Sequence, residues 1–467
     1  MSLSPELHSS RSEFLGEGSY GCVYYPGITC NGKKNKKKLI TKIQEINFYS
    51  DNEKNNGKYI KANIKNYNKY LSPVIKYCIV KFNTIEKSSL NIGKCNILFD
   101  EYNSSANINY EDIIYNSSAS RDSPLVNDQY ILMYSSYIKS YTLKDFYSKY
   151  SIDFVFSALT HINKILYALS LLNQIGIVHN DLHIHNVLIN LKNLNPVIID
   201  FGLSFNINNC YKFNKDYIDF QYIKKFVHDY REDSYHINIE KRFISFIIFN
   251  KVSSFPSEIF DNNDNNNISK AAITFFINDA INSILNNEEI RKYFNNNEMI
   301  EYKKALEQFY YQFLDKSVYP KYNTIVKYLL NFVHMYNDLY SLIIDFLYLN
   351  ELKVYKQQLI LNNEEQVILE FFIQLYKKGL HPDPNMRLKI SELLDLYKFI
   401  INFIKNYDLK TAKNSIRNIM ITELVTFLKS KNISIKIVFY KEFAFLNFNL
   451  LCTDLIFQTI KSSSIKL

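Results

Sequence analysis

Three polar residues at fixed offsets, Asp181, Asn186 and Asp200, carry the clearest chemical signal in the sequence. The apolar residues 187–189 and 196–200 are predicted to be two short buried strands joined by a polar turn. Such a hairpin would bring Asn186 and Asp200 near one another, with Asp181 on the loop just before it. One carboxylate that orients a hydroxyl and accepts its proton, beside a carboxamide and a carboxylate that can hold Mg²⁺, is typical of phosphoryl transfer. A surface turn rich in His, Asn and Asp would explain a lone H-x-D, but not the whole ordered pattern.

The pattern H-x-D-L-x-x-x-N, followed by a strand and D-F-G, resembles the catalytic core of the eukaryotic-type protein kinases. The residues that carry the resemblance are His179, Asn180, Asp181, Leu182, Asn186, Asp200, Phe201 and Gly202. The loop sequence HNDLHIHN is most similar to that of the divergent serine/threonine kinases of large DNA viruses, the mimivirus-like group. The resemblance implies that Asp181 is catalytic and that Asn186 and Asp200 hold the metal. Two positions depart from the family pattern: Asn180 replaces an arginine, and His183 replaces a lysine that would contact the transferred phosphate.

A G-x-G-x-x-G pattern stands near the N-terminus and is followed by the strand-like residues 22–25. A dinucleotide fold would need a strand before this pattern and a helix after it, so a hairpin is the better prediction. Glycines there would let backbone N–H groups close over nucleotide phosphates; the alternative is an ordinary glycine-rich hairpin. The resemblance implies a nucleotide-binding set: Leu15, Gly16, Gly18, Ser19, Gly21, Val23, Lys42, Ser136 and Ile138.

Lys42 lies in the predicted strand 39–43. In the family this lysine grips the first two phosphates of the nucleotide, which implies a catalytic role for Lys42, and it pairs with a glutamate on the next helix. Glu53 is the first candidate for that partner and Glu45 the second. A helix is predicted over residues 51–71, although glycine and asparagine are poor helix formers.

Further elements follow from apolar patterns. Residues 88–128 are rich in serine and asparagine and are predicted to be a long loop. Residues 129–138 are predicted to be a strand leading into the hinge that, by resemblance, contacts adenine through the backbone. A helix capped by threonine is expected to follow it, and residues 152–175 have the apolar spacing of a core helix beneath the catalytic loop.

Two late motifs also match the kinase pattern. The segment 337–343 resembles the helix that opens with D-x-[WY]-S-[LF], which implies that Asp338 accepts hydrogen bonds from the catalytic-loop backbone. The segment 381–387 resembles a D-P-x-x-R element, which implies that Arg387 forms a buried bidentate pair with a glutamate of the activation segment. Glu240 and Glu258 remain the two candidates for that glutamate.

Composition sets broad limits. The 467 residues are 47% hydrophobic, enough for a sizeable core and more than one lobe. The net charge of +9 is spread along the chain, so no dedicated nucleic-acid binding is expected. The six cysteines include no C-x-x-C pair and are expected to be free thiols in a reducing compartment. No signal pattern and no membrane span are expected.

The predicted fold class is α+β, a bilobal kinase-like fold with a small antiparallel β lobe and a larger, mainly helical lobe. The expected organisation is a flexible N-terminus (1–11), a kinase-like domain (12–405) and a C-terminal extension (406–467). Within that domain we expect a small lobe over 12–138, a large lobe over 139–405 and a partly disordered insertion over 241–330.

The resemblance implies a protein kinase that uses ATP and Mg²⁺ and phosphorylates Ser or Thr of protein substrates. Nothing in the catalytic loop marks tyrosine specificity. Two alternatives stay open: a small-molecule kinase of the aminoglycoside or choline type, which His183 would suit, and a pseudokinase scaffold. We expect an intracellular location, in host cytoplasm or virion if the protein is viral.

Overall fold

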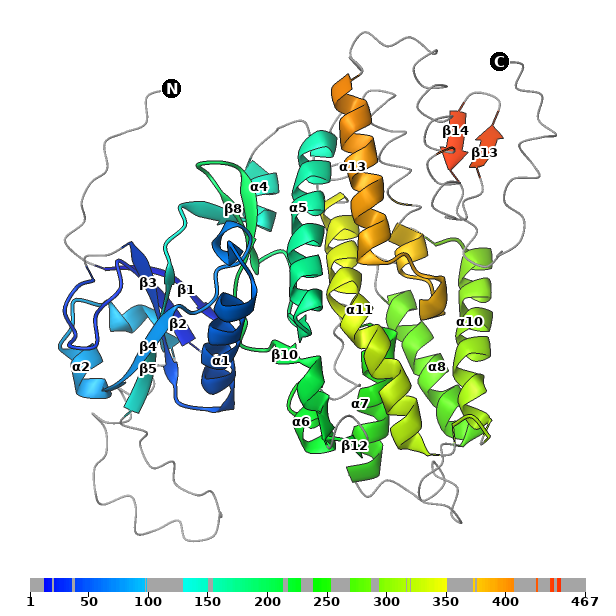
Figure 1. Cartoon of the computed structure of the whole chain (residues 1–467), viewed down its shortest axis with the longest axis horizontal. Helices are drawn as coiled ribbons and strands as arrows, with labels where there is room; N and C mark the ends of the chain where they lie inside the picture. Colours follow the sequence, from blue (N-terminus) through cyan, green and yellow to red (C-terminus); the bar gives the residue numbers. More distant parts are fainter. Residues whose placement is uncertain are drawn as a thin grey trace. The chain divides into compact units, whose positions relative to one another are not determined.

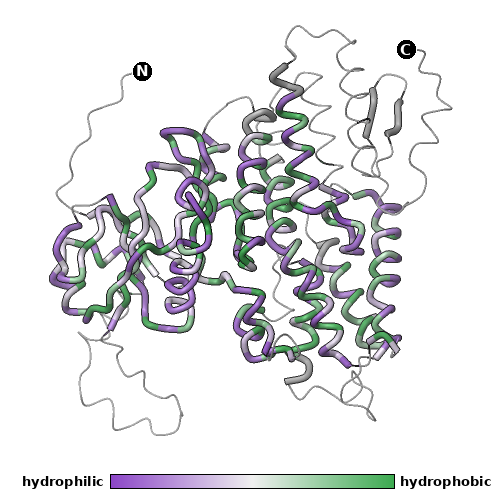
Figure 2. Tube along the Cα trace, in the orientation of Figure 1, coloured by the Kyte–Doolittle hydropathy of each residue, from purple (hydrophilic) through white to green (hydrophobic). Residues whose placement is uncertain are grey.

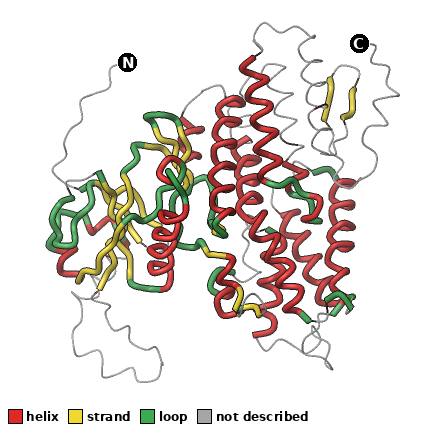
Figure 3. The backbone as a smooth tube through the Cα atoms, viewed as in Figure 1, coloured by secondary structure: helices red, strands yellow, loops and turns green. Residues whose placement is uncertain are grey.

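A computed structural model describes most of the chain (Figure 1). The described residues are 12–18, 21–35, 38–96, 98, 129–149, 154–212, 217–227, 238–252, 269–286, 294–315, 317–319, 321–350, 373, 376–406, 426, 437–440 and 443–446. The chain divides into two compact units, one of 1–140 with 199–204 and one of 141–198 with 205–467. The first is built mainly from strands and the second mainly from helices, as the colours of Figure 3 show. This agrees with the predicted α+β class, which has a small antiparallel β part and a larger, mainly helical part.

The first unit is a five-stranded antiparallel sheet in the order β1-β2-β3-β5-β4. Its strands are β1 (Glu13–Gly18), β2 (Gly21–Tyr25), β3 (Leu39–Glu45), β4 (Lys76–Lys81) and β5 (Gln129–Ser136). The helical elements are α1 (Phe48–Asn63), α2 (Phe82–Glu86) and the 3₁₀ turns η1 (Tyr67–Lys69) and η2 (Ile92–Lys94). The predicted strands at 39–43 and 129–138 are therefore present.

Strand β5 lies inside the sheet, and both of its faces are buried. Tyr130, Leu132 and Tyr134 face one hydrophobic cluster, which includes residues of β2 and β3. Ile131 and Met133 face a second, smaller cluster. Because successive side chains of a strand point to opposite faces, this run is continuously apolar instead of alternating.

Helix α1 forms although its composition is poor in helix formers. Asn47 and Ser50 make a reciprocal capping box that satisfies two backbone N–H groups at its start. Gly57 is buried, and a side chain there would collide with the carbonyl oxygen of Val74. The glycine that weakens the local helix signal therefore allows close packing. The helix begins before the predicted residue 51 and ends at Asn63, earlier than the predicted 71.

The second unit contains several short strands. They are β6 (Ser140–Thr142), β7 (Ile177–Val178), β8 (Val187–Asn190), β9 (Asn195–Ile198), β10 (Phe205–Asn206), β11 (Tyr211–Lys212), β12 (Tyr217–Ile218), β13 (Ile437–Tyr440) and β14 (Phe443–Leu446). The predicted hairpin is present as β8 and β9, which pair antiparallel with Val187 opposite Ile198. β6 joins them in a three-stranded sheet.

The helical elements of the second unit are α4 (Leu143–Lys149), α5 (Phe154–Gln174), η4 (Ile207–Cys210), α6 (Phe220–Lys224), α7 (Ile239–Val252), α8 (Lys270–Asn286), α10 (Asn296–Tyr311), η5 (Gln312–Leu314), α11 (Tyr322–Asn350), η7 (Pro384–Met386) and α13 (Ile390–Asn406). Thr142 caps α4 as predicted, since its hydroxyl oxygen accepts from the backbone N–H of Asp145 at 3.1 Å. Helix α5 is the predicted core helix, and α13 packs along it (Figure 1).

Helices α7, α8 and α10 lie in the segment predicted to be an insertion. They share an aromatic cluster in which the rings of Phe243, Phe276 and Tyr310 are fully buried and lie 4.7–5.4 Å apart. Figure 2 shows α7 and α8 mostly in the hydrophobic colour. These helices pack into a core because their apolar faces meet.

The cysteines correct one prediction. Disulfides join Cys22 to Cys95 and Cys30 to Cys78, whereas Cys210 is free and buried. The expectation of free thiols is wrong for these four residues, because the sheet brings together cysteines 73 and 48 residues apart. The argument from free thiols to a reducing compartment loses its basis at these positions.

Reduction of these two bonds should lower the melting temperature of the protein. Each cross-link restricts the unfolded chain, an effect of about 2–4 kcal/mol. Melting curves recorded with and without reductant measure it, and a Cys22→Ser/Cys95→Ser/Cys30→Ser/Cys78→Ser variant should show no response. Peptide mapping that finds Cys22, Cys30, Cys78 and Cys95 alkylated in the native protein would contradict the assignment.

Some predictions lie outside the described residues. They include the flexible N-terminus 1–11, Ser19, Glu258, residues 99–128 of the long loop, residues 253–268 and 287–293 of the insertion predicted to be partly disordered, and most of the extension 406–467. Among the helices that the structure describes, none combines the length and the apolar character needed to cross a membrane.

Candidate active site

The glycine-rich hairpin is formed by β1 and β2, with Gly18 opposite Gly21. An added side-chain carbon on Gly16 or Gly18 would meet no atom of the described chain within 4 Å, so the protein's own packing does not require glycine there. Gly21 differs, since a side chain would run into the backbone of Ile43 on the neighbouring strand β3. The open space at the first two glycines is the room that a phosphate-binding backbone needs.

Lys42 on β3 forms the charged centre of the first unit. Its Nζ lies 2.8 Å from Glu53 Oε2 on α1 and 3.2 Å from Asp200 Oδ1. The structure therefore decides the open alternative in favour of Glu53. Burial alone would lower the pKa of Lys42, but the two carboxylates outweigh it and hold the pKa above its ordinary value. The ammonium stays charged, and the Asp200 carboxylate keeps 38% of its side-chain surface exposed.

Asp200 itself sits in a left-handed conformation, with φ of 59°. Such a backbone is uncommon for a residue with a side chain and points to a local constraint. One of its carboxylate oxygens accepts from the N–H of Gly202 at 3.3 Å. This contact is a local side-chain-to-backbone turn within the D-F-G triplet.

Two asparagines of α1 hold the segment that follows Asp200, and the sequence analysis did not identify them. Asn52 donates to the carbonyls of Gly202 and Ser204 at 2.7 and 2.6 Å. Asn56 donates to the carbonyls of Phe201 and Ser204 at 3.2 and 2.8 Å. Residues four apart share a helix face. These asparagines are poor helix formers, but they anchor the D-F-G segment beside Glu53.

The catalytic loop in the second unit brings Asp181 and Asn186 together. Asn186 Nδ2 donates to the backbone carbonyl of Asp181 at 2.8 Å and to its carboxylate at 3.1 Å. Because its amide nitrogen makes these hydrogen bonds, the side-chain oxygen of Asn186 remains as a ligand for a hard cation. His183 lies nearby, with 3.9 Å between its Nε2 and Asp181 Oδ2. Its other ring nitrogen accepts from the N–H of His185.

Helix α11 fixes the backbone of this loop as the D-x-Y-S-L motif predicted. The Asp338 carboxylate accepts from the N–H groups of His179 and Asn180 at 2.7 and 2.8 Å. The expectation that the helix opens at this motif is wrong, because α11 already begins at Tyr322. Asp345, one heptad further on and 2% exposed, accepts from the backbone of Ile184, and burial raises its pKa well above the ordinary value. The spacing of seven, two helical turns, is the sequence signal for this second carboxylate.

Arg387 and Glu240 form the bidentate pair predicted for the late motif. Their two N···O distances are both 2.8 Å, and neither side chain is exposed. Arg387 Nε also donates to the carbonyl of His381 at 2.7 Å. The structure therefore favours Glu240, and the rival Glu258 lies outside the described residues.

The remaining nucleotide-binding predictions fall on the first unit. Leu15 is 45% exposed on β1, and Val23 is half-buried on β2. Ser136 ends β5 opposite Leu39, and the carbonyl of Ile138 accepts from the hydroxyl of Ser140. These contacts place the residues without testing their predicted roles.

An antiparallel sheet with a largely buried lysine–glutamate pair, and a helical unit with a carboxylate–carboxamide loop, define a phosphotransferase of the kinase type. The protein kinase domain family matches residues 76–397, more than half of the chain, and the chain belongs to that family. The match begins at β4, so the glycine-rich hairpin and the Lys42–Glu53 pair are recognised from their geometry. No curated protein matches the chain.

Proposed function

We propose that this protein kinase uses ATP and Mg²⁺ to phosphorylate serine or threonine of protein substrates. The observation that carries the proposal is Lys42 held between Glu53 and Asp200, a cation with only 14% of its side chain exposed beside a carboxylate that stays partly exposed. Such a lysine suits the phosphates of a nucleotide, and such a carboxylate suits a metal ion. A relationship to the kinases of large DNA viruses is a further part of the proposal, supported by the wording HNDLHIHN.

The residues present fit the nucleotide and the metal. Gly16 and Gly18 leave open space beside a hairpin backbone, and Lys42 supplies a charged donor. Asn186 of the second unit and Asp200 of the first each carry an oxygen of the kind that Mg²⁺ prefers, and these two residues would hold the metal. When bound, Mg²⁺–ATP supplies the phosphoryl group and the positive charge that offsets its developing negative charge.

The roles of the protein residues follow from their contacts. Asp181 orients the acceptor hydroxyl and takes its proton, while Asn186 fixes the Asp181 backbone and side chain. Glu53 holds Lys42 in place so that the ammonium binds phosphate oxygens. His183 stands where the family has a lysine, and it contributes a neutral or charged hydrogen-bond donor to the transferred phosphate.

Phosphoryl transfer should require a divalent metal and should favour a protein acceptor. Purified protein is incubated with γ-labelled ATP and, in parallel, a peptide library of Ser, Thr and Tyr acceptors, an aminoglycoside and choline. We expect label on Ser or Thr with Mg²⁺, no label with EDTA, and recovery on adding excess Mg²⁺. The Asp200 and Asn186 ligand set is the physical reason.

Each other outcome contradicts a stated part of the proposal. Label on tyrosine alone would exclude Ser/Thr specificity. Label on the aminoglycoside or choline in place of the peptides would indicate a small-molecule kinase. Nucleotide binding without label on any acceptor would indicate a pseudokinase scaffold.

A further inference from the structure

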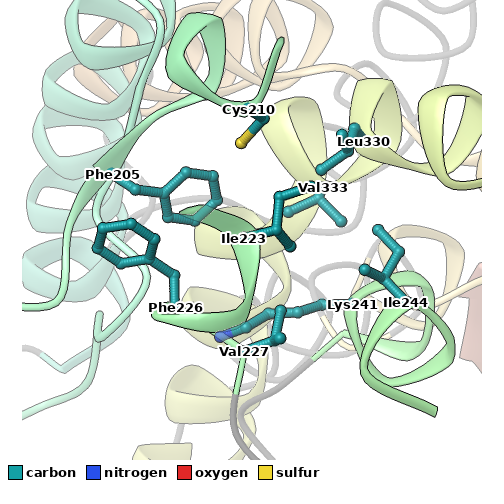
Figure 4. A pocket seen from close by; sticks show the side chains of 9 residues that line it. All are labelled: Phe205, Cys210, Ile223, Phe226, Val227, Lys241, Ile244, Leu330 and Val333. Atoms are coloured by element: carbon teal, nitrogen blue, oxygen red, sulfur yellow. The ribbon is translucent and has the colours of Figure 1, made fainter. Parts of the chain in front are cut away.

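Lys241 is a buried lysine next to Glu240 at the start of α7, and only 2% of its surface is exposed. Its aliphatic stem lines a small apolar cavity of about 10 Å³ together with Phe226, Val227 and Ile244. Figure 4 shows the nitrogen on the side of the cavity where Phe226 and Val227 lie. A methionine could fill the same space as the stem, so packing explains the stem but not the ammonium.

The ammonium reaches the catalytic loop. Lys241 Nζ donates to Asn180 Oδ1 at 2.6 Å, and Asn180 Nδ2 donates to the carbonyl of Phe226 at 3.2 Å. The backbone N–H of Asn180 donates to Asp338 at the same time. Asn180 therefore connects α7, the segment after α6, and α11.

The backbone of Asn180 explains why asparagine suits this position. Its φ is 68°, in the left-handed region that asparagine tolerates better than most residues. Its side chain can accept and donate at once, which an arginine at this position could not do. The departure from the family pattern at residue 180 is thus matched by the lysine at 241.

The charged groups that act on Lys241 are carboxylates, whereas Cys210 of η4, which lines the same cavity, stays a neutral thiol because burial raises its pKa. Among the described residues, the carboxylates that act on it are Asp338 of α11 and Asp181 of the catalytic loop. The neighbours from the segment after α6, Phe226 and Val227, are apolar. Burial lowers the pKa of Lys241 to about 8, against the opposing pull of the two carboxylates.

We propose that Lys241 is a positioning residue for phosphoryl transfer. Its buried ammonium holds the catalytic loop through Asn180, and its positive charge attracts the Asp181 carboxylate. It supplies a positive charge to a loop that has Asn180 and His183 where the family has arginine and lysine. Glu240, paired with Arg387, fixes the start of the helix that carries it. The inference rests on the proposed function, because its kinetic readout is phosphoryl transfer.

The test compares Lys241→Met, Lys241→Arg and a control, Lys378→Met. Methionine keeps the apolar packing and removes the charge, so kcat should fall about 10- to 100-fold with KM for ATP unchanged. Lys378 is also buried in the second unit, and burial lowers its pKa too, but the carboxylate acting on it is Asp383. Its methionine variant should keep kcat within about two-fold of the wild type.

The pH profile adds a readout that a merely structural lysine would not move. If the charged form is needed, wild-type kcat should fall as pH rises through about 8. Arginine stays charged in this range, so Lys241→Arg should be more active than Lys241→Met and should lose that basic limb. An identical profile for wild type and Lys241→Arg would overturn the proposal, as would a Lys241→Met kcat equal to the wild type.

Backbone hydrogen exchange gives a second readout that needs no turnover. Exchange at the His179 and Asn180 amides, which donate to Asp338, should become about 10-fold faster in Lys241→Met and stay unchanged in Lys378→Met. Unchanged exchange in Lys241→Met, or equal acceleration in both variants, would overturn the positioning role. A wild type without turnover on any acceptor would instead refute the proposed function, and the exchange result would still decide the role of Lys241.

Discussion

Replacing Asp181 by alanine is expected to lower kcat about 100- to 10,000-fold while nucleotide affinity stays unchanged. The reason is that the Asp181 carboxylate is proposed to act on the acceptor hydroxyl and not on the nucleotide. In the structure it is tied to Asn186 and stays 38% exposed, so it is both oriented and accessible. Steady-state kinetics give kcat, and titration with a fluorescent nucleotide gives the affinity.

A matched comparison uses the other proposed acidic residue. Asp200→Asn should also abolish transfer, but it should weaken Mg²⁺-dependent nucleotide binding, because Asp200 is proposed to hold the metal. If both variants lose nucleotide affinity equally, the division of roles is wrong. An Asp181→Ala variant with wild-type turnover would remove Asp181 from the mechanism.

Arg387→Ala is expected to lower the free energy of unfolding of the second unit by about 3–5 kcal/mol, a larger effect than on nucleotide affinity. The guanidinium makes two hydrogen bonds to Glu240 and one to the carbonyl of His381, with no exposed surface on either side chain. Removal of arginine leaves the Glu240 carboxylate buried without this partner, which is costly. Chemical denaturation and thermal melting measure the change.

Two controls sharpen this prediction. Lys304→Ala breaks an exposed pair with Glu301 and should cost no more than about 1 kcal/mol. A Glu240→Leu/Arg387→Met double variant should cost less than the two single changes together, since it leaves no buried charge behind. A melt that Arg387→Ala does not change would show that the pair contributes nothing to stability.

The sequence by itself was enough for the order of the motifs and for the local elements that carry them. The hairpin of β8 and β9, the cap at Thr142 and the apolar helix α5 depend on residues close together in the chain. Periodicity and turn chemistry act over such short distances, so these elements could be predicted. The motif resemblance then pointed from Asp181, Asn186 and Asp200 to the protein kinase family, which the family match supports.

Only the tertiary structure chose between equivalent residues far apart in sequence. It pairs Lys42 with Glu53 and Arg387 with Glu240, where the sequence left two glutamates for each. It also shows that Asn47 and Ser50 cap α1 and that Gly57 packs tightly, contacts that support a helix whose residues are poor helix formers.

The disulfides and Lys241 also depend on contacts between residues far apart in sequence, which the sequence pattern did not predict. Cys22 and Cys95 are 73 residues apart, and no local spacing marks them as partners. Lys241 lies 61 residues from Asn180 and looks like one more lysine in a lysine-rich sequence. The packing of distant segments decides which side chains meet and which charges are buried. A pattern of neighbouring residues does not determine that packing.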